Sequence, residues 1–295
     1  MKNTKEIYGI VLLACGLATS LKAQDIYVAS YGKIGEYGMD GTTINSSLVS
    51  GVYASGIAIS GNDLYAAGGA GVAEYNATSG ASINTHLVNT GGAGIAVSGN
   101  NLFVAQDGTG NIISEFNATT GATENFFFIS GLSQPYGIAI SGQGQIYVAN
   151  YNPTGSYGAI GEYNSSGGAI NTLFATGLGG PYGLAVSGND LYVANFNAGT
   201  IGEYTTSGAV VNASLISGLE KPGYIAISGN NLFVVSDQLG TVGEYDAMTG
   251  AAINANLITG LTDPTGIAIS PAPEPSTVAL AGLGTAGLWL WRRRK

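Results

Sequence analysis

The sequence predicts an all-β fold, a six-bladed β-propeller that closes on itself between residues 24 and 271. Three observations support this prediction: the composition, a repeat of about 40 residues, and the strands at which the repeat begins and ends. The chain has 295 residues, including 48 glycines and 17 tyrosines, and only 9% of them are charged. Glycine permits the positive φ angles of tight turns, and aromatic and β-branched side chains suit pleated sheets. This composition therefore favours many short strands joined by tight turns.

The repeat is marked by six copies of Gly-Ile-Ala-Ile-Ser or a near variant. Its first aliphatic residue is Ile57, Ile95, Ile138, Leu184, Ile225 and Ile267. A glutamate followed by an aromatic residue recurs in step with it, at Glu36, Glu74, Glu115, Glu162, Glu203 and Glu244. Both series advance by 38 to 47 residues, which is the range of a four-stranded propeller blade.

Each copy is expected to form four short strands, A to D. In the clearest copy these strands are 183–187, 191–194, 201–204 and 210–216. The Gly188-Asn189 step between strands A and B suits a tight hairpin, because both residue types tolerate positive φ. Continuous apolar runs such as Ile-Ala-Ile fit strands that are covered on both faces, as neighbouring blades cover one another.

The two ends of the repeat predict how the ring closes. The first strand, 26–29, has the pattern of strand B, and the last, 267–269, has the pattern of strand A. The C-terminal strand A can therefore complete the N-terminal set of strands B, C and D, with the seam between residues 26–50 and 266–270. Closure protects sheet edges that an open array would expose. A solenoid of parallel coils is disfavoured, because hairpins rather than crossovers join these strands.

One further feature of the repeat is a family resemblance. The run Pro181-Tyr182-Gly183-Leu184-Ala185-Val186, followed by Leu191-Tyr192-Val193-Ala194-Asn195, resembles the NHL-type propeller repeat. That pattern is Pro-x-Gly-aliphatic-Ala-Val and then aliphatic-Tyr-Val-Ala-Asp, and all six copies resemble it. The chain departs from it where Asn, Ser or Gly replaces the usual Asp, and no arginine opens strand C. The resemblance implies the fold but no single function, because NHL-type propellers bind proteins, RNA or small molecules and some are enzymes.

The N-terminal segment, residues 1–23, is predicted to be a secretory signal peptide. Two lysines precede an apolar run from Ile7 to Leu21, and cleavage is expected after Ala23. The only cysteine, Cys15, lies in this segment, within a stretch that also loosely resembles a bacterial lipobox, so lipidation of Cys15 is left open. Cleavage after Ala23 leaves a mature protein without cysteine, which must be stable through packing alone.

The C-terminal segment, residues 272–295, combines three features in a specific order. A Pro273-Glu274-Pro275 motif precedes an uncharged stretch and a basic end formed by Arg292, Arg293, Arg294 and Lys295. This order resembles the PEP-CTERM sorting signal, which implies that a transmembrane helix holds the exported protein in the membrane until an exosortase removes the tail. The apolar part, 277–291, is shorter than the roughly 20 residues of an ordinary spanning helix. Signal peptidase and exosortase are the expected processing partners, and the cell surface or extracellular matrix is the expected destination.

The charge of the mature body excludes some partners. Without its processed ends, the chain keeps only Lys33 and Lys221 as basic residues, while nearly all of its 18 acidic residues remain. Nucleic acids and anionic membrane surfaces require clustered basic side chains. We therefore expect no nucleic-acid partner, and membrane contact only through the tail before processing.

No catalytic or metal-binding constellation is evident, and no cofactor is expected. His86, the only histidine, is expected on an outer strand without a triad partner. The six repeated glutamates are expected to play a structural role, with their carboxylates bonded to the backbone or to water at the sheet edge. The run 282–287 matches the dinucleotide-binding fingerprint, but it lies in the tail without a preceding strand, so we treat it as a false positive.

Residues that differ between blades predict a ligand-binding face. Loops that join strand B to C and strand D to A should share one face of the propeller. The expected ligand-binding residues there are Tyr31, Tyr136, Asn150, Tyr151, Tyr182, Asn195, Phe196, Tyr224 and Asp237, with Asp107, Asn152 and Asn197 beside them. Aromatic rings together with amide and carboxylate groups suit sugars, which offer C–H faces and hydroxyls. Alternatively, Tyr136 and Tyr182 cap the packing between blades. A second asymmetry, Phe126-Phe127-Phe128 on an outer strand, suggests a partner patch.

These observations favour a non-enzymatic, exported surface or matrix protein whose propeller binds or scaffolds a polysaccharide or an envelope protein. The PEP-CTERM resemblance favours the polysaccharide, because it implies bacteria that make exopolysaccharide. One alternative is a secreted propeller lyase or lactonase with a metal in its channel. For that function the D–A loops offer only Glu220 and Asp263 as acids, on adjacent blades. Another alternative is a spacer without a specific ligand.

Overall fold

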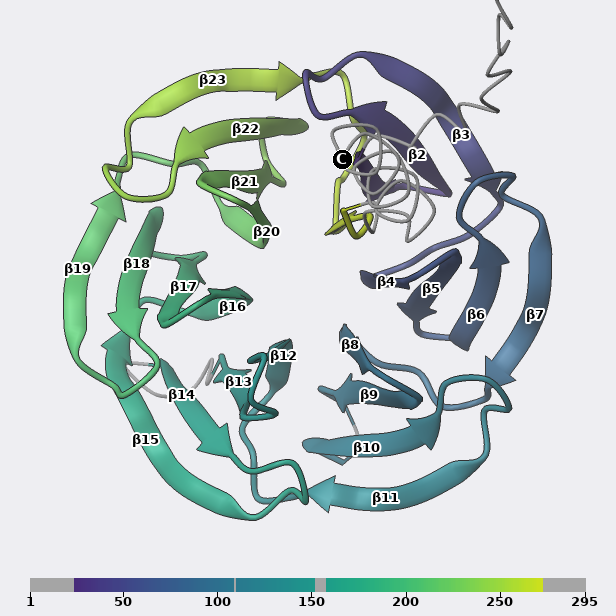
Figure 1. Ribbon diagram of the computed structural model, residues 1–295, viewed down its shortest axis with the longest axis horizontal. Coiled ribbons are helices and arrows are strands. Elements are labelled where there is room, and N and C mark those ends of the chain that lie inside the picture. Colours follow the sequence, from purple (N-terminus) through teal and green to yellow (C-terminus); the bar gives the residue numbers. More distant parts are fainter. Residues whose placement is uncertain (1–23, 109, 152–157, 273–295) are drawn as a thin grey trace, which may run out of the picture. The chain divides into compact units, whose positions relative to one another are not determined.

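The computed structural model describes residues 24–108, 110–151 and 158–272, in which every regular element is a β-strand. Six four-stranded antiparallel sheets stand around a central axis as the blades of a propeller (Figure 1). This confirms the predicted all-β, six-bladed fold. The predicted signal peptide and the predicted transmembrane helix of the tail lie outside the described residues. Within the described residues, no helix has the length and apolar character needed to span a membrane.

The strands of each blade follow one another from the axis to the rim (Figure 1). Blade 1 consists of β24 (Gly266–Ile269), β1 (Asp25–Ser30), β2 (Lys33–Gly38) and β3 (Thr43–Ser50). Blade 2 consists of β4 (Gly56–Ser60), β5 (Asp63–Gly68), β6 (Gly71–Asn76) and β7 (Ser82–Val88). Blade 3 consists of β8 (Gly94–Ser98), β9 (Asn101–Gln106), β10 (Ile112–Asn117) and β11 (Thr123–Ile129).

The second half of the ring has the same arrangement. Blade 4 consists of β12 (Pro135–Ile140), β13 (Ile146–Asn150), β14 (Gly158–Tyr163) and β15 (Ala169–Leu178). Blade 5 consists of β16 (Pro181–Ser187), β17 (Asp190–Asn195), β18 (Thr200–Thr205) and β19 (Val210–Ile216). Blade 6 consists of β20 (Pro222–Ser228), β21 (Asn231–Ser236), β22 (Thr241–Asp246) and β23 (Ala252–Ile258).

Blade 1 joins the two ends of the repeat. The C-terminal strand β24 pairs with β1, so that Ile26 lies opposite Ile269 and Val28 opposite Ile267. Beyond the pairing, the Asp25 N–H donates to Ser270 Oγ at 2.8 Å. This is the pairing that the order of strands in the sequence predicts. Residues 24–272 form one compact unit, which holds the strand pairings and buried clusters of the described residues.

The apolar core lies between neighbouring blades. Strand β1, the second strand of its blade, is buried along its whole length, and β5 is buried at every position except its first. One core cluster joins Tyr27 and Ala29 of blade 1 to Leu64 and Ala66 of blade 2. Strands that are covered on both faces carry continuous apolar runs, which is the pattern present in the sequence.

The outermost strands are interrupted by a recurring bulge. The pairing of the third and fourth strands shifts register in all six blades. In five blades an asparagine Oδ1 accepts the backbone N–H two residues ahead, at 3.0–3.1 Å. These asparagines are Asn45, Asn84, Asn171, Asn212 and Asn254. A bulge twists an edge strand and disrupts its free hydrogen-bonding groups, which protects the rim of the propeller against edge-to-edge pairing.

Glycines bring the innermost strands together around the axis. A Cβ atom built on Gly94 would lie 1.7 Å from the carbonyl oxygen of Tyr136, and one on Gly137 would lie 2.2 Å from that of Tyr182. Five blades have glycine at this position. Blade 6 has Tyr224 instead, because its sequence is Pro-Gly-Tyr where blades 4 and 5 have Pro-Tyr-Gly. This exchange places a large side chain at the axis.

Candidate functional site

Five aromatic side chains gather where the innermost strands of blades 4, 5 and 6 begin. Three of them, Tyr136, Tyr182 and Tyr224, lie near the starts of β12, β16 and β20. The other two, Tyr151 and Phe196, directly follow β13 and β17. All five are half-buried, and we refer to them together as the aromatic cluster.

Tyr182 is the centre of the aromatic cluster. Its ring stacks on Tyr136, with centroids 4.3 Å apart and planes inclined by 25°, and on Phe196, at 5.3 Å and 29°. Tyr224 and Tyr151 meet it edge-on, at 5.3 and 6.3 Å. Offset-stacked and edge-to-face pairs are the preferred aromatic geometries, so these rings hold one another in place. The cluster therefore also packs blades 4, 5 and 6 together.

Tyr224 crosses the channel of the propeller. Its hydroxyl donates a hydrogen bond to the carbonyl oxygen of Ala93, at 3.0 Å, although Ala93 belongs to blade 3 on the opposite side of the ring. Burial raises the pKa of Tyr224 well above its ordinary value, and the neighbouring Tyr182, Tyr136 and Asp107 raise it further. The hydroxyl therefore stays protonated and remains a donor. Tyr224 thus obstructs the channel beside the aromatic cluster.

The loops that lead into these strands have an uncommon backbone conformation. Gln134, Lys221 and Asp263 have φ angles of 45°, 51° and 43°, and each directly precedes a proline. In blade 5 the same position is Gly180, with a φ of 74°. Residues other than glycine rarely adopt positive φ, so surrounding contacts must hold them there. In blades 4, 5 and 6 these loops position Tyr136, Tyr182 and Tyr224, which follow the prolines by one or two residues.

Acidic side chains surround the aromatic cluster. Burial raises the pKa of Tyr136, and the charge of Asp107 contributes to the shift. Burial, and then the charge of Asp263, raise the pKa of Asp237. The basic residue of this face is Lys221, whose ammonium lies 4.8 Å from the ring centroid of Phe196 and 3.5 Å from Asn197 Oδ1. The face is therefore acidic overall, and its lysine is engaged within the protein.

A depression of about 550 Å³ adjoins the aromatic cluster at the mouth of the channel. Tyr136 and Tyr182 contribute its aromatic wall, and among the described residues Asp107 is the only charged one that lines it. Its remaining lining is small or polar: Ser55, Gly69, Thr90, Gly91, Gly92, Ala93, Gln106 and Gly108. A concave site with aromatic surface and a few polar groups is the usual form of a small-ligand site.

The other residues expected on this face lie in different surroundings. Tyr31 is exposed and meets Tyr53 edge-on at 5.1 Å, away from the aromatic cluster. Asn195 is buried, and its Nδ2 donates to Thr200 Oγ1 at 3.3 Å. Asn150 accepts a hydrogen bond from the Ser133 N–H at 3.2 Å. The two asparagines therefore contact strand ends and loops, while Asn152 lies outside the described residues.

The repeated glutamates are packed within the blades. In blades 3 and 6 an asparagine amide donates to the glutamate, Asn101 to Glu115 at 2.8 Å and Asn231 to Glu244 at 2.7 Å. In blades 1, 2 and 5 the position of this asparagine is occupied by an aspartate. Two residues later these three blades have a tyrosine, where blades 3 and 6 have a phenylalanine. Burial raises the pKa of Glu74 in blade 2, and the charge of Asp63 adds to this shift. Within the described residues, no three His, Cys, Asp or Glu side chains are close enough to hold a metal ion.

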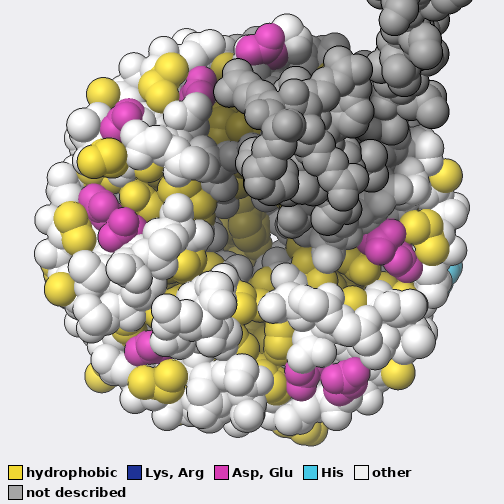
Figure 2. All heavy atoms as spheres, in the orientation of Figure 1, with side chains coloured by type: hydrophobic (Ala, Val, Ile, Leu, Met, Phe, Trp, Pro, Cys, Tyr) yellow, Lys and Arg dark blue, Asp and Glu magenta, His cyan; other side chains and the backbone are white. Residues whose placement is uncertain are grey.

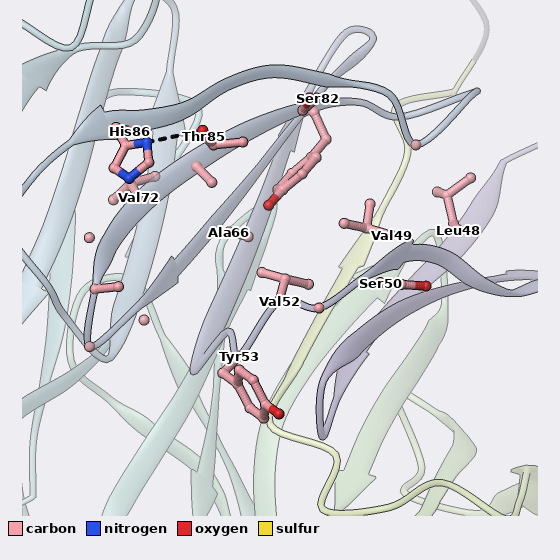
Figure 3. Close-up of a pocket in the computed structure, with 18 residues that line it drawn as sticks. Leu48, Val49, Ser50, Val52, Tyr53, Ala66, Val72, Ser82, Thr85 and His86 are labelled. Atoms are coloured by element: carbon pink, nitrogen blue, oxygen red, sulfur yellow. Dashed lines mark hydrogen bonds between the residues drawn. The ribbon is translucent and has the colours of Figure 1, made fainter.

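His86 lies beside a groove of about 740 Å³ between blades 1 and 2 (Figure 3). Its Nδ1 is 3.0 Å from Thr85 Oγ1, and none of the described residues that line the groove is acidic. Grooves of about 500 and 460 Å³ occur at the corresponding places between blades 4 and 5 and between blades 3 and 4. Because the groove recurs, we attribute it to blade packing. The depression at the channel mouth is built from residues that differ between blades.

The exposed phenylalanines form a separate feature on the rim. Phe127 is 67% exposed and Phe126 is 37% exposed, while Phe128 is buried. The side chain of Phe128 packs in the core between blades 3 and 4. Only two of the three therefore form surface.

Three features of the site were not predicted from the sequence. The glycine-rich wall of the depression and the position of Lys221 over Phe196 depend on how separate loops meet in space. The bond between Tyr224 and Ala93 was missed as well, although it has a signal in the sequence. The exchange of glycine and tyrosine in blade 6 sets Tyr224 apart from the other tyrosines.

Comparison with known proteins identifies the tail of the chain and the fold of its body. Residues 271–295 match the family model of the PEP-CTERM protein-sorting motif. The chain carries a PEP-CTERM signal. This signal indicates export, a transient C-terminal membrane anchor and processing by an exosortase. No curated protein matches the chain.

Two solved structures resemble the propeller. A chain from a nidogen/laminin complex is 17% identical, with a TM-score of 0.75, and the match covers 85% of this chain and all of that one. A gluconolactonase from Xanthomonas campestris is 18% identical, with a TM-score of 0.58, covering 70% of this chain and 76% of that one. At such identities the likeness shows the fold alone.

Proposed function

We propose that the exported propeller is a non-enzymatic binding module for an extracellular polysaccharide, acting at the cell surface or in the extracellular matrix. The observation that carries this proposal is the aromatic wall of Tyr136 and Tyr182 beside the depression at the channel mouth. The PEP-CTERM signal supports an extracellular ligand, because it indicates export.

The chemistry of the depression suits a sugar. A pyranose ring presents a C–H face that packs against an aromatic side chain, and its hydroxyls need hydrogen-bonding groups at the same time. Tyr136 and Tyr182 offer the aromatic surface, and Asp107 offers a carboxylate acceptor. The glycines of the opposite wall leave backbone groups accessible at close range.

The arrangement of titratable groups disfavours the alternative of a lyase or lactonase. General acid–base catalysis needs two positioned groups, and of the residues that the structure describes only Asp107 and the tyrosines are titratable in the depression. Burial keeps those tyrosines protonated, because it raises the pKa of Tyr136 and Tyr182 above its ordinary value. The Tyr224 side chain also takes up space at the channel mouth, where a channel metal would be held.

A glycan-array screen of residues 24–272 tests the proposal, followed by titration calorimetry with the glycans that bind. We expect binding to a limited set of glycans, and Tyr136→Ala should weaken it at least about tenfold, as expected for the loss of roughly 1.4 kcal/mol of contact. Tyr53→Ala is the matched control, since Tyr53 is exposed and lies outside the aromatic cluster. Melting curves of both variants separate lost binding from lost folding.

Two results would refute the proposed function. One is the absence of binding to any glycan. The other is a tightly bound stoichiometric metal, measured on the same sample, together with lactone hydrolysis or glycan cleavage; this result would favour the enzyme.

A further inference from the structure

We infer that the depression selects glycans that carry free amino groups, so that its ligand is an amino-sugar polysaccharide. This inference rests on the proposed function and specifies its ligand class. It follows from the position of one carboxylate beside the aromatic wall and from the charge of the whole face.

The lining of the depression combines aromatic rings with a single negative charge. Asp107 is the only charged residue of the depression within the described part of the chain, and it lines the same depression as Tyr136 and Tyr182. An ammonium group is attracted both to a carboxylate and to the face of an aromatic ring. A charged sugar amine can therefore interact with the carboxylate and with an aromatic ring at once, whereas a hydroxyl interacts with the carboxylate alone.

The aromatic cluster already accepts one ammonium group of the protein itself. Lys221 Nζ lies 4.8 Å from the ring centroid of Phe196. Lys221 does not line the depression, where the carboxylate of Asp107 instead has the Tyr136 hydroxyl as a hydrogen-bond neighbour. Burial and the charge of Asp107 both raise the pKa of Tyr136, which places the negative charge close to this ring.

The surroundings of the depression repel anions. Residues 24–272 contain two lysines and no arginine, because seven of the nine basic residues lie in the two ends of the chain. The same range contains 16 of the 18 acidic residues, since only Glu6 and Glu274 lie outside it. Figure 2 shows one face of the ring, on which acidic side chains are spread and no basic side chain is visible. At the depression itself, burial and the neighbouring Tyr136, Asp107 and Asp237 raise the pKa of Tyr182, which places a second carboxylate near the aromatic wall. A surface with this balance lowers the local concentration of uronate or sulfate groups and raises that of amines.

Binding of chitosan oligosaccharides and of their fully N-acetylated counterparts tests the inference, because the two share a sugar ring and differ in charge. Alginate oligosaccharides serve as the anionic comparison. Calorimetry on residues 24–272 at moderate salt should show chitosan binding about tenfold or more tighter than the N-acetylated form, with alginate unbound. Asp107→Asn should abolish this preference while binding of the N-acetylated form persists. Glu124→Gln, which removes the same charge from an exposed site on the rim, is the matched control.

The outcomes separate this inference from the proposed function. Tighter binding of the N-acetylated form, or Tyr136-dependent binding of alginate, would overturn the inference and leave a glycan-binding module. Chitosan binding that Asp107→Asn and Glu124→Gln weaken equally would also overturn it, since the acidic surface as a whole would then be the cause. Failure to bind any glycan would refute the proposed function itself.

Discussion

The contact between innermost strands around the axis gives a sharp test of how this ring is held together. A Cβ atom on Gly94 would lie 1.7 Å from the Tyr136 carbonyl oxygen and 2.8 Å from its carbonyl carbon. Real Cβ atoms essentially never approach a neighbour within 3.0 Å. The obstructing atoms belong to the backbone of the next blade, so no side-chain rotation can relieve the clash. Gly94→Ala therefore requires blade 3 or blade 4 to move.

The magnitude follows from the kind of atom that must move. Overpacking a well-packed site costs about 1–3 kcal/mol when side chains can adjust, and more when they cannot. We expect Gly94→Ala to lower the free energy of unfolding by about 3 kcal/mol or more. For a domain of this size each kcal/mol lowers Tm by about 2–4 °C, so Tm should fall by roughly 6–12 °C.

The measurement compares Gly94→Ala with Gly223→Ala by urea unfolding and by thermal melting. Gly223 also lies in an innermost strand, but a Cβ there would meet nothing closer than the Val235 carbonyl oxygen at 3.9 Å, and its φ is not positive. Gly223→Ala should therefore change stability by no more than about 1 kcal/mol. If the two variants unfold within about 1 kcal/mol of each other, the innermost strands have room to spare and the reasoning about the ring is wrong.

Three further predictions concern single contacts, each checked by urea unfolding. Asp63→Asn should stabilise the protein by roughly 1 kcal/mol at pH 8, because an amide there can donate to Glu74 as it does in blades 3 and 6. The pKa of Glu74 is raised in the folded state, so its contribution to stability is present at low pH and is lost as pH rises through that pKa. The stability gained by Asp63→Asn should therefore shrink near pH 4, where Glu74 is protonated. An equal gain at pH 4 and pH 8 would contradict this account. Tyr224→Phe should cost about 1–2 kcal/mol, because it leaves the Ala93 carbonyl without its donor; unchanged stability would show that this bond across the channel contributes nothing. Asn212→Ala should cost about 1 kcal/mol while Asn212→Asp, which keeps the acceptor, should not; equal losses would exclude the side-chain bond at the bulge as the cause.

The fold was predictable because its information is local and repeated. Apolar runs mark the strands of each blade, Gly-Asn steps mark the turn between strands A and B in blades 2, 3, 5 and 6, and the spacing of the copies is that of a propeller blade. The strand pairing in the structure, Asp190–Asn195 against Thr200–Thr205, extends the predicted strands by one or two residues. Such differences are expected, because strand ends depend on hydrogen bonds that propensity does not specify.

The candidate site was predictable only as a set of residues on one face. The sequence places Tyr136, Tyr151, Tyr182, Phe196 and Tyr224 in loops and strand starts that share a face, and the structure brings these five together. Which rings stack depends on side-chain rotamers and on the angle between blades, and neither follows from spacing. For the same reason the burial of Asn195 and the separation of Tyr31 were not evident from the sequence.

The differences between blades follow a physical pattern. Where a residue of the blade interior changes, its neighbour changes with it: an aspartate accompanies Tyr65 opposite Glu74, and an asparagine accompanies Phe103 opposite Glu115. In blade 1 the tyrosine hydroxyl donates to the glutamate, Tyr27 to Glu36 at 3.1 Å, whereas in blades 3 and 6 the asparagine amide donates. These paired changes act within one blade, so they carry no information about a ligand.

The exchange of glycine and tyrosine in blade 6 differs from these changes, because the contact that it creates lies outside its own blade. Tyr224 replaces the glycine that five blades use for close packing, and its hydroxyl bonds to the opposite blade instead. The exchange of glycine and tyrosine therefore changes the channel mouth and not the packing within blade 6. Because Tyr224 obstructs the channel there, we expect a polymer to lie across the depression, with its internal sugars bound, rather than to insert an end along the axis. Calorimetry with oligosaccharides of increasing length tests this, since affinity should rise with length when internal sugars are bound, and should not change when only an end is bound.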